Sequence, residues 1–203
     1  KITKYNVMKN KDKILEIIKE RNITQLIHFT NKKNIYSILK NGLLNNDELH
    51  KRNLKYIYND PERRDKWTFT ISLSVTNKNS QLYEAFMYKQ KLNNSDFVEI
   101  KINPNVIAEK ECIFCDTNAA NHTFDQYRQN KDDLDILKLH PAFNGMFKKI
   151  VKKHTLNTGG KIMRFNQKPN ETTCNHAEIC LIGNITPDKF INYDELKKFA
   201  DGQ

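Results

Sequence analysis

The chain has 203 residues, of which 38% are hydrophobic and 29% charged, with only 6 glycines and 5 prolines. This composition indicates a globular protein and excludes a disordered chain, and the length suits a single domain over residues 1–203. No apolar stretch is long enough to cross a bilayer, and no signal-peptide pattern opens the chain. We therefore predict a monomeric, cytoplasmic protein without a membrane partner.

The charge of the chain favours a polyanionic partner, either a nucleic acid or an anionic membrane. The net charge is +10 and the pI is about 9.3. Basic residues concentrate in the first predicted helix, at residues 148–153 and at residues 161–168. A groove that tracks phosphates would explain this pattern, and a solvated basic face explains it equally well.

Secondary structure follows from the spacing of the apolar residues. Predicted helices cover residues 11–21, 32–41, 82–87 and 142–153. Predicted strands cover residues 26–29, 67–74, 97–102 and 177–182. The segment 45–65 reads as an extended loop with one helical turn, and most of 116–175 reads as loop. Because strands outnumber long helices and no strand–helix–strand alternation appears, we predict an α+β domain and not a parallel Rossmann sheet.

The segment around His28, Phe29 and Thr30 is the most informative part of the chain. A strand here leads into a short helix that Thr30 or Asn31 can cap and that Gly42 ends. His28 and Thr30 therefore stand near a helix N-terminus, where unpaired backbone N–H groups favour a phosphate or an amide. Taken alone, the stretch is better explained as a core element whose histidine has no function than as a binding site.

The four cysteines predict no metal site. Cys112 and Cys115 have a zinc-knuckle spacing, but Cys174 and Cys180 are too far apart in sequence to form the second close pair of a four-cysteine site. Cys112 and Cys115 also flank Ile113 and Phe114, a pattern typical of a buried strand. We interpret all four as reduced thiols in the core.

Charged residues near the predicted strands suggest a catalytic or phosphate-binding site. Glu178 stands in an apolar strand directly after a long loop, where a carboxylate either faces solvent or is held in a cleft for catalysis. Arg63 and Arg64 form a twin arginine in a loop, which is either solvated or able to clamp phosphates. The chain contains no Walker loop, GxGxxG, GxSxG or HExxH motif.

The order of these motifs resembles the DarT family of nucleic-acid-modifying ADP-ribosyltransferase toxins. The order is His-x-Thr from His28, Asn-hydrophobic-x2-Ile-Leu-x2-Gly-Leu-Leu from Asn34, Glu-Arg-Arg at 62–64, Ser-x-Ser at 72–74 and Ala-Glu-hydrophobic at 177–179. The segment 111–120 is also similar to a C-x-F-C-x-T-N-A-A stretch of one branch. The resemblance covers most of residues 22–192. One departure is Val-Thr-Asn at 75–77, where that branch usually has Phe-Pro-Asn.

The resemblance implies an ADP-ribosyltransferase-like split antiparallel sheet with flanking helices and NAD+ bound as co-substrate in the cleft between its halves, with no metal. His28 and Thr30 would hold the nicotinamide end, and Phe29 would contribute backbone contacts. Further positions that match residues of the family's site are Ser37 and Leu44 in the same pocket, Arg64 as the essential NAD-binding arginine, and Glu178 as the essential glutamate.

The implied activity is a glycosyl transfer from NAD+ to a nucleobase. A carboxylate on the ribose 2′-OH would stabilise the positive charge that develops when the nicotinamide–ribose bond breaks. The loop 155–175 would contact the acceptor, with Lys161, Arg164, Phe165 and Lys168 suited to phosphates and bases.

We expect single-stranded DNA as the acceptor, since the larger part of the family acts on DNA. The role implied is that of a toxin in a bacterial toxin–antitoxin or phage-defence system, opposed by a macrodomain or a binding antitoxin. Three alternatives remain: the same chemistry on RNA such as mRNA, transfer to protein, and a non-catalytic nucleic-acid-binding domain with Glu178 on its surface.

Overall fold

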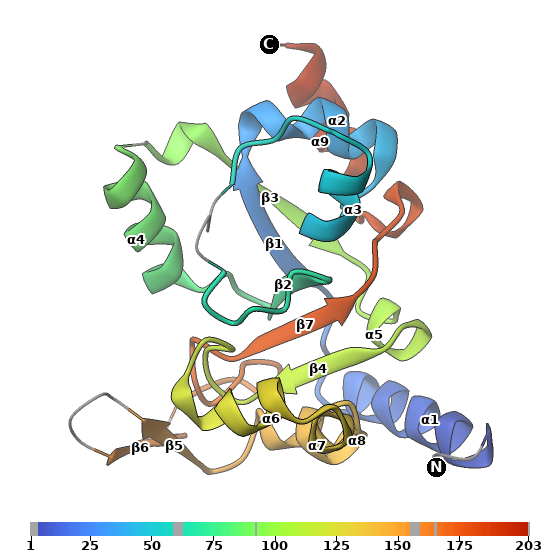
Figure 1. Cartoon of the computed structure of the whole chain (residues 1–203), viewed down its shortest axis with the longest axis vertical. Helices are drawn as coiled ribbons and strands as arrows, with labels where there is room; N and C mark the ends of the chain where they lie inside the picture. The colour runs from blue at the N-terminus through green and yellow to red at the C-terminus, as the bar shows by residue number, and fades with distance from the viewer. Residues whose placement is uncertain (1–3, 59–62, 92, 155–158, 165, 203) are drawn as a thin grey trace.

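The molecule is built around one five-stranded antiparallel sheet in the strand order β3-β1-β2-β7-β4. The structure is a computed structural model and describes residues 4–58, 63–91, 93–154, 159–164 and 166–202. The strands of the sheet are β1 (Leu26–Asn31), β2 (Thr70–Val75), β3 (Phe97–Ile102), β4 (Cys112–Cys115) and β7 (Glu178–Ile182). Figure 1 shows β1 and β3 in the upper half of the molecule and β2, β7 and β4 crossing the lower half.

The sheet is split between β1 and β2. Strand β1 pairs with β3 along its whole length, whereas it meets β2 at only two positions, Leu26 with Val75 and Ile27 with Ser74. Beyond those pairs the two strands separate, and β2 continues along β7. The predicted α+β class and split antiparallel sheet are therefore confirmed.

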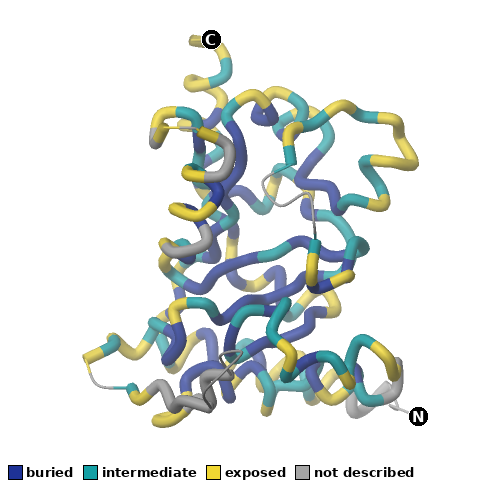
Figure 2. The backbone as a smooth tube through the Cα atoms, turned by 60° about the vertical axis from the view of Figure 1, so that its left-hand side comes forward, coloured by how far each residue is buried: buried dark blue, intermediate teal, exposed yellow. Residues whose placement is uncertain are grey.

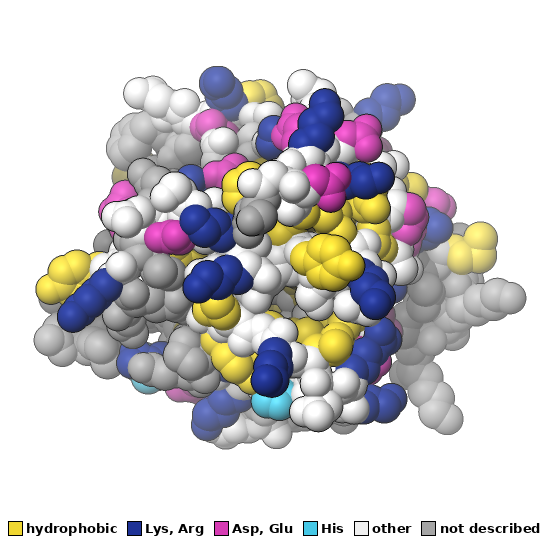
Figure 3. Space-filling view, turned by 90° about the horizontal axis from the view of Figure 1, so that it is seen from above, with side chains coloured by type: hydrophobic (Ala, Val, Ile, Leu, Met, Phe, Trp, Pro, Cys, Tyr) yellow, Lys and Arg dark blue, Asp and Glu magenta, His cyan; other side chains and the backbone are white. Residues whose placement is uncertain are grey.

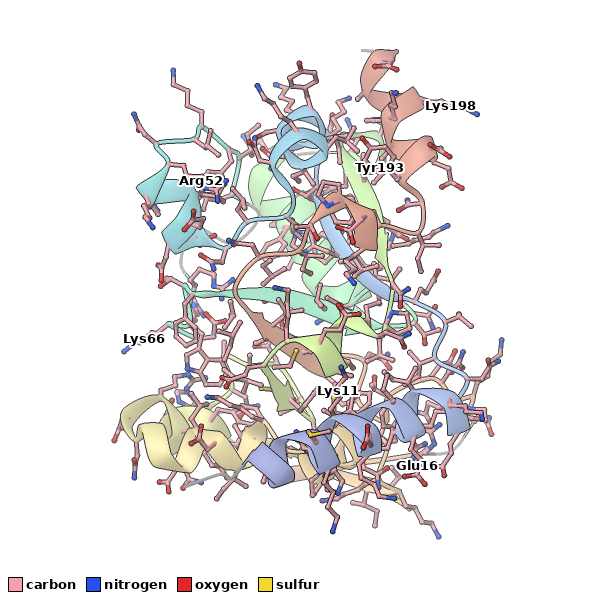
Figure 4. The ribbon with its side chains drawn as sticks, turned by 90° about the vertical axis from the view of Figure 1, so that its right-hand side faces the viewer. Lys11, Glu16, Arg52, Lys66, Tyr193 and Lys198 are labelled. Atoms are coloured by element: carbon pink, nitrogen blue, oxygen red, sulfur yellow. The ribbon has the colours of Figure 1, made fainter. Side chains whose placement is uncertain are left out.

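Helices cover both halves of the sheet. In the upper half α2 packs against α9, and in the lower half α1 packs against α5 and α8. Figure 4 shows α1 lying along the lower edge, with Lys11 and Glu16 on it. The helices are α1 (Lys4–Glu20), α2 (Ile35–Asn41), α3 (Asn46–Lys51), α4 (Ser80–Gln90), α5 (Val106–Glu109), α6 (Asp125–Gln129), α7 (Lys131–Leu137), α8 (His140–Gly145) and α9 (Tyr193–Asp201), and the short 3₁₀ turns are Lys32–Asn34, Asn94–Asp96, His122–Phe124 and Pro187–Lys189.

None of the described helices combines the length and the apolar character that crossing a membrane requires.

Strand β7 lies at the centre of the core, and side chains on both of its faces are buried. Figure 2 shows that the buried stretches of backbone run through the middle of the molecule. Ile179 and Leu181 point into the larger apolar cluster, which includes residues of α1, α2 and β1. Cys180 points to the opposite face, into a smaller cluster with Trp67. Side chains alternate along a strand, so Glu178 lies on the same face as Cys180.

The end of α2 is a glycine for a steric reason. Gly42 has φ +84° and its N–H donates to the Ile38 carbonyl at 2.8 Å. A Cβ at this position would lie 2.5 Å from the Ile185 carbonyl oxygen. The predicted helix end at Gly42 is confirmed, and the glycine lets the chain turn tightly into the Leu43–Ile185 bridge.

The predicted helix over residues 142–153 is confirmed only at its beginning and is wrong beyond Gly145. Helix α8 ends at Gly145, and the residues after it form a separate hairpin of β5 (Ile150–His154) and β6 (Gly159–Met163). Phe143, Met146 and Phe147 are buried and have the spacing of a helix. Ile150 has the same spacing in the sequence, but it is exposed and begins β5. The apolar period therefore extends past the point where the helix ends.

The cysteines occupy the core in the way that the sequence predicts for reduced thiols. All four are free and buried. Cys112 and Cys115 lie on opposite faces of β4, in different apolar clusters, so their sulfur atoms do not converge on one ion. Burial raises the pKa of both thiols well above the ordinary value. Among the described residues no three or more His, Cys, Asp or Glu side chains are grouped as a metal site would require.

Candidate active site

A cavity of about 700 Å³ opens where β1 and β2 separate. Its walls come from β1, α2, α3 and the segment 56–58 on one side, and from β2, the segment 118–122 and the start of β7 on the other. This volume lies within the range of about 300–1,000 Å³ that small-molecule and cofactor sites occupy. His28, Thr30, Ser37, Leu44, Arg64 and Glu178 all contribute to its lining.

Asn34 joins the end of β1 to the segment that covers the cavity. Its Nδ2 donates to the Thr30 hydroxyl at 3.0 Å and to the Ile57 carbonyl at 2.9 Å, and its Oδ1 accepts from the Ile57 N–H at 2.8 Å. Asn31, one of the two caps predicted from the sequence, accepts from the Lys33 N–H and begins a 3₁₀ turn that precedes α2. Ser37 lies one turn further on, and its hydroxyl accepts from Asn41 at 3.2 Å.

His28 connects the two halves of the sheet across the split. Its Nδ1 lies 3.0 Å from the Ser72 carbonyl oxygen, and because a carbonyl only accepts, Nδ1 carries the proton. Burial lowers the pKa of His28, and the nearby Arg63 acts in the same direction, while the Ser72 carbonyl opposes them. The ring is therefore neutral at pH 7, with Nε2 as an acceptor.

Acidification is expected to destabilise the protein partly through His28. The ordinary pKa of a histidine is about 6.5, so below that pH the unfolded chain takes up a proton that the folded chain resists. The free energy of unfolding should fall as the pH drops through this range, and the fall should be smaller in His28→Gln. Urea unfolding of both proteins between about pH 5 and pH 8 measures the difference. Equal pH dependence in the two proteins would assign the effect to other groups.

Phe29 lines the cavity between His28 and Thr30. Its ring packs away from the split, against Tyr83, Phe86 and Phe97 at centroid distances of 5.4, 6.0 and 6.1 Å. This packing anchors β1 to α4 and β3. The geometry suits the backbone role that the resemblance implies for this residue.

The two arginines of the twin have different surroundings. The Arg63 guanidinium, 15% exposed, pairs with Asp65 at 3.0 Å and donates to the Thr70 hydroxyl at 3.0 Å and to the Trp67 carbonyl. Arg64 is exposed and lines the cavity, and Lys66 extends away from the protein (Figure 4). The interpretation of the twin arginine as solvated is therefore wrong for Arg63, which ties the loop to the start of β2.

Glu178 is buried in the cavity wall. It is the first residue of β7, is 6% exposed, and accepts a hydrogen bond of 2.6 Å from the Ala119 N–H. The neighbouring turn is shaped by Asn118, whose Oδ1 accepts from the Ala120 N–H at 2.9 Å. The alternative in which Glu178 is a surface residue is therefore wrong. A carboxylate in a buried wall, oriented by a backbone donor, is suited to stabilising developing positive charge.

Arg128 in α6 is a feature of this region that the sequence did not indicate. Its guanidinium contacts the carbonyls of Asp65, Ala119 and Asn121 and the Asp125 carboxylate. The sequence places it in a polar, mixed-charge segment that fits a solvated face. The nearest indication of a functional site in the sequence is the Thr-Asn-Ala-Ala run at 117–120.

The residues predicted to bind nucleic acid lie outside the cavity lining or outside the described side chains. Lys161 belongs to β6 but its side chain is not described, and Phe165 lies outside the described residues. The Arg164 guanidinium binds the carbonyls of Glu171 at 2.6 Å, Gln167 at 3.4 Å and Lys168. Arg164 thus orders its own loop, while Lys168 is exposed. Their contact with nucleic acid stays a prediction.

Comparison with known proteins identifies related sequences and folds. A family model described as "ssDNA thymidine ADP-ribosyltransferase, DarT" matches residues 27–140, a range that includes His28, Arg64 and the 118–121 turn. No curated protein matches the chain.

Two solved structures are similar to the chain. Thermosipho africanus DarTG in complex with ADP-ribose aligns with a TM-score of 0.50 and 14% identity, covering 88% of this chain and 47% of that one. The chain thus spans about half the length of that relative. Thermus sp. 2.9 DarT in complex with NAD+ aligns with a TM-score of 0.47 and 11% identity, covering 89% of each chain.

Proposed function

Because the chain belongs to the DarT family, described as ssDNA thymidine ADP-ribosyltransferases, we propose that it transfers ADP-ribose from NAD+ to a nucleobase of single-stranded DNA. The observation that supports the proposal is that Glu178 lines the same cavity as His28, Thr30 and Arg64. Thymidine is the acceptor that the family description suggests. We take residues 1–203 as one ADP-ribosyltransferase domain.

Most of these residues bind NAD+, whereas Glu178 stabilises the charge that develops in the reaction. His28, Thr30 and Ser37, with the Phe29 backbone, hold the nicotinamide end of NAD+, and Leu44 provides apolar contact. Arg64 binds NAD+ and helps to activate the acceptor base. Glu178 accepts from the ribose 2′-OH, and its negative charge stabilises the ribose as the nicotinamide bond breaks and a ring atom of the base attacks.

The acceptor is proposed to be a nucleic acid, with the net charge of +10 in support. In Figure 3, Lys and Arg side chains are spread over the face seen from above, with Asp and Glu side chains between them, and do not form one continuous patch. Transfer to RNA or to protein is the alternative. We also propose that the protein acts in the cytoplasm as the toxin of a toxin–antitoxin or phage-defence system, with a macrodomain or a binding antitoxin as antagonist.

Single-stranded DNA should be modified faster than a duplex of the same sequence. A paired base is inaccessible in the stack, and exposing it costs a few kcal/mol. Incubation with labelled NAD+ and separate pools of single-stranded DNA, duplex DNA, RNA and protein measures the preference directly. Binding to DNA should also weaken steeply between about 50 and 200 mM salt. Label that appears only on protein, or equally on both DNA forms, would contradict the proposal.

A further inference from the structure

The Arg128 side chain bonds to several separate residues next to the cavity. Its Nε donates to the Asp65 carbonyl at 3.1 Å, and one terminal nitrogen donates to the Asn121 carbonyl at 3.0 Å and to the Ala119 carbonyl. The other terminal nitrogen binds the Asp125 carboxylate. The side chain is only 9% exposed, and the guanidinium lies 5.7 Å from the Trp67 ring centroid.

These contacts join two segments that carry the proposed reactive groups. Ala119 accepts from Arg128 through its carbonyl and donates to Glu178 through its N–H, so one residue lies between the guanidinium and the carboxylate. Asp65 accepts from Arg128 through its carbonyl, immediately after Arg64 in the chain. The cavity walls that hold Glu178 and Arg64 are therefore connected through one side chain.

Only an arginine can make this connection. Its planar guanidinium carries five N–H donors in a fixed arrangement, whereas a lysine has three donors on one atom. Lysine at this position keeps the positive charge beside Asp125 but cannot reach carbonyls in separate segments together. The Arg128→Lys variant thus separates the geometry of the contacts from their charge.

We propose that Arg128 is a positioning residue that orients the Glu178 carboxylate through the 118–121 turn and holds the Arg64 loop against it. This inference rests on the proposed ADP-ribosyl transfer. A turn that shifts by 1 Å moves the Ala119 donor and with it the carboxylate, and misplacement of that size costs about 100-fold in rate. The loss falls on kcat, because the charge that Glu178 stabilises exists only in the transition state.

The test compares Arg128→Lys with Arg52→Lys, a change of the same kind at an exposed arginine that pairs with Glu48 within α3. We expect Arg128→Lys to lower kcat for ADP-ribosyl transfer by about 100-fold with little change in the KM for NAD+, and Arg52→Lys to match the wild type. Asn118→Ala, which loosens the same turn without removing the arginine, should lower kcat in the same direction. Circular dichroism and thermal unfolding confirm that each variant is folded at the assay temperature.

A double variant decides whether Arg128 acts through Glu178. If it does, Arg128→Lys should cost much less in the Glu178→Gln background than in the wild type, whereas a general loss of structure would cost the same in both. Wild-type kcat in folded Arg128→Lys, or additive losses in the double variant, would overturn the inference. Absence of transfer by the wild-type protein would instead overturn the proposed function, so the two failures are distinguishable.

Discussion

Glu178→Gln is expected to abolish most ADP-ribosyl transfer while leaving the protein folded. The amide keeps the shape of the side chain and can still accept from the Ala119 N–H, which donates at 2.6 Å in the native protein. It lacks the negative charge that, in the proposed reaction, stabilises the ribose in the transition state. Loss of one such electrostatic contribution lowers kcat by about 100-fold to 1,000-fold.

Radiolabelled NAD+ with single-stranded DNA measures this effect, and thermal unfolding monitors the fold. Glu195→Gln, a change of the same kind at an exposed position of α9, is the matched control. The control should transfer at the wild-type rate and melt at the wild-type temperature. Near-native transfer by Glu178→Gln would show that the carboxylate has no catalytic role.

Alanine substitution of the two neighbouring arginines should separate stability from activity. Arg63→Ala leaves the Asp65 carboxylate, 8% exposed at its side chain, without its ion-pair partner. Breaking a buried pair in this way costs about 3–5 kcal/mol of unfolding free energy. Arg64→Ala should cost less stability than Arg63→Ala, because the Arg64 side chain is exposed at the cavity. It should weaken NAD+ binding by about 1.5–3 kcal/mol, the contribution of a hydrogen bond to a charged group.

Urea unfolding gives the stability of both variants, and calorimetric titration with NAD+ gives the affinity of Arg64→Ala. The two variants serve as controls for each other because the sequence change is the same at adjacent positions. Equal stability of Arg63→Ala and the wild type would mean that the Arg63–Asp65 pair does not hold the loop. Unchanged NAD+ affinity in Arg64→Ala would remove Arg64 from the binding site.

The periodicity of the sequence predicts most of the sheet but not its arrangement. Alternating apolar residues place β1, β2 and β3 to within about three residues, a normal error for element boundaries. The pairing of β2 with β7, however, depends on contacts between distant parts of the chain that local spacing does not encode. For the same reason the period over 142–153 predicts a helix where the chain turns at Gly145 and forms a hairpin.

The candidate site, likewise, could be predicted from the sequence only in part. Residue type and order single out His28, Thr30, Arg64 and Glu178 through the family resemblance, and all four line the cavity. Which arginine of the twin pairs with Asp65 depends on the conformation of the loop, where Arg63 has φ +37°. The contacts of Arg128 likewise involve backbone carbonyls, which every residue has, so its sequence neighbourhood contains no sign of them.

The strand order has a consequence for how the protein folds during synthesis. Strand β7 is the last of the five sheet strands in sequence order, yet it lies between β2 and β4. It pairs Thr70 with Ile182 and Cys112 with Leu181. Until β7 leaves the ribosome, β4 lacks the strand that it pairs with and β2 is held to β1 at only two positions. Such non-local pairing slows folding and favours partly ordered intermediates. We therefore expect the growing chain to bind NAD+ only after synthesis has passed residue 182, since the same strand that completes the sheet also brings Glu178 into the cavity.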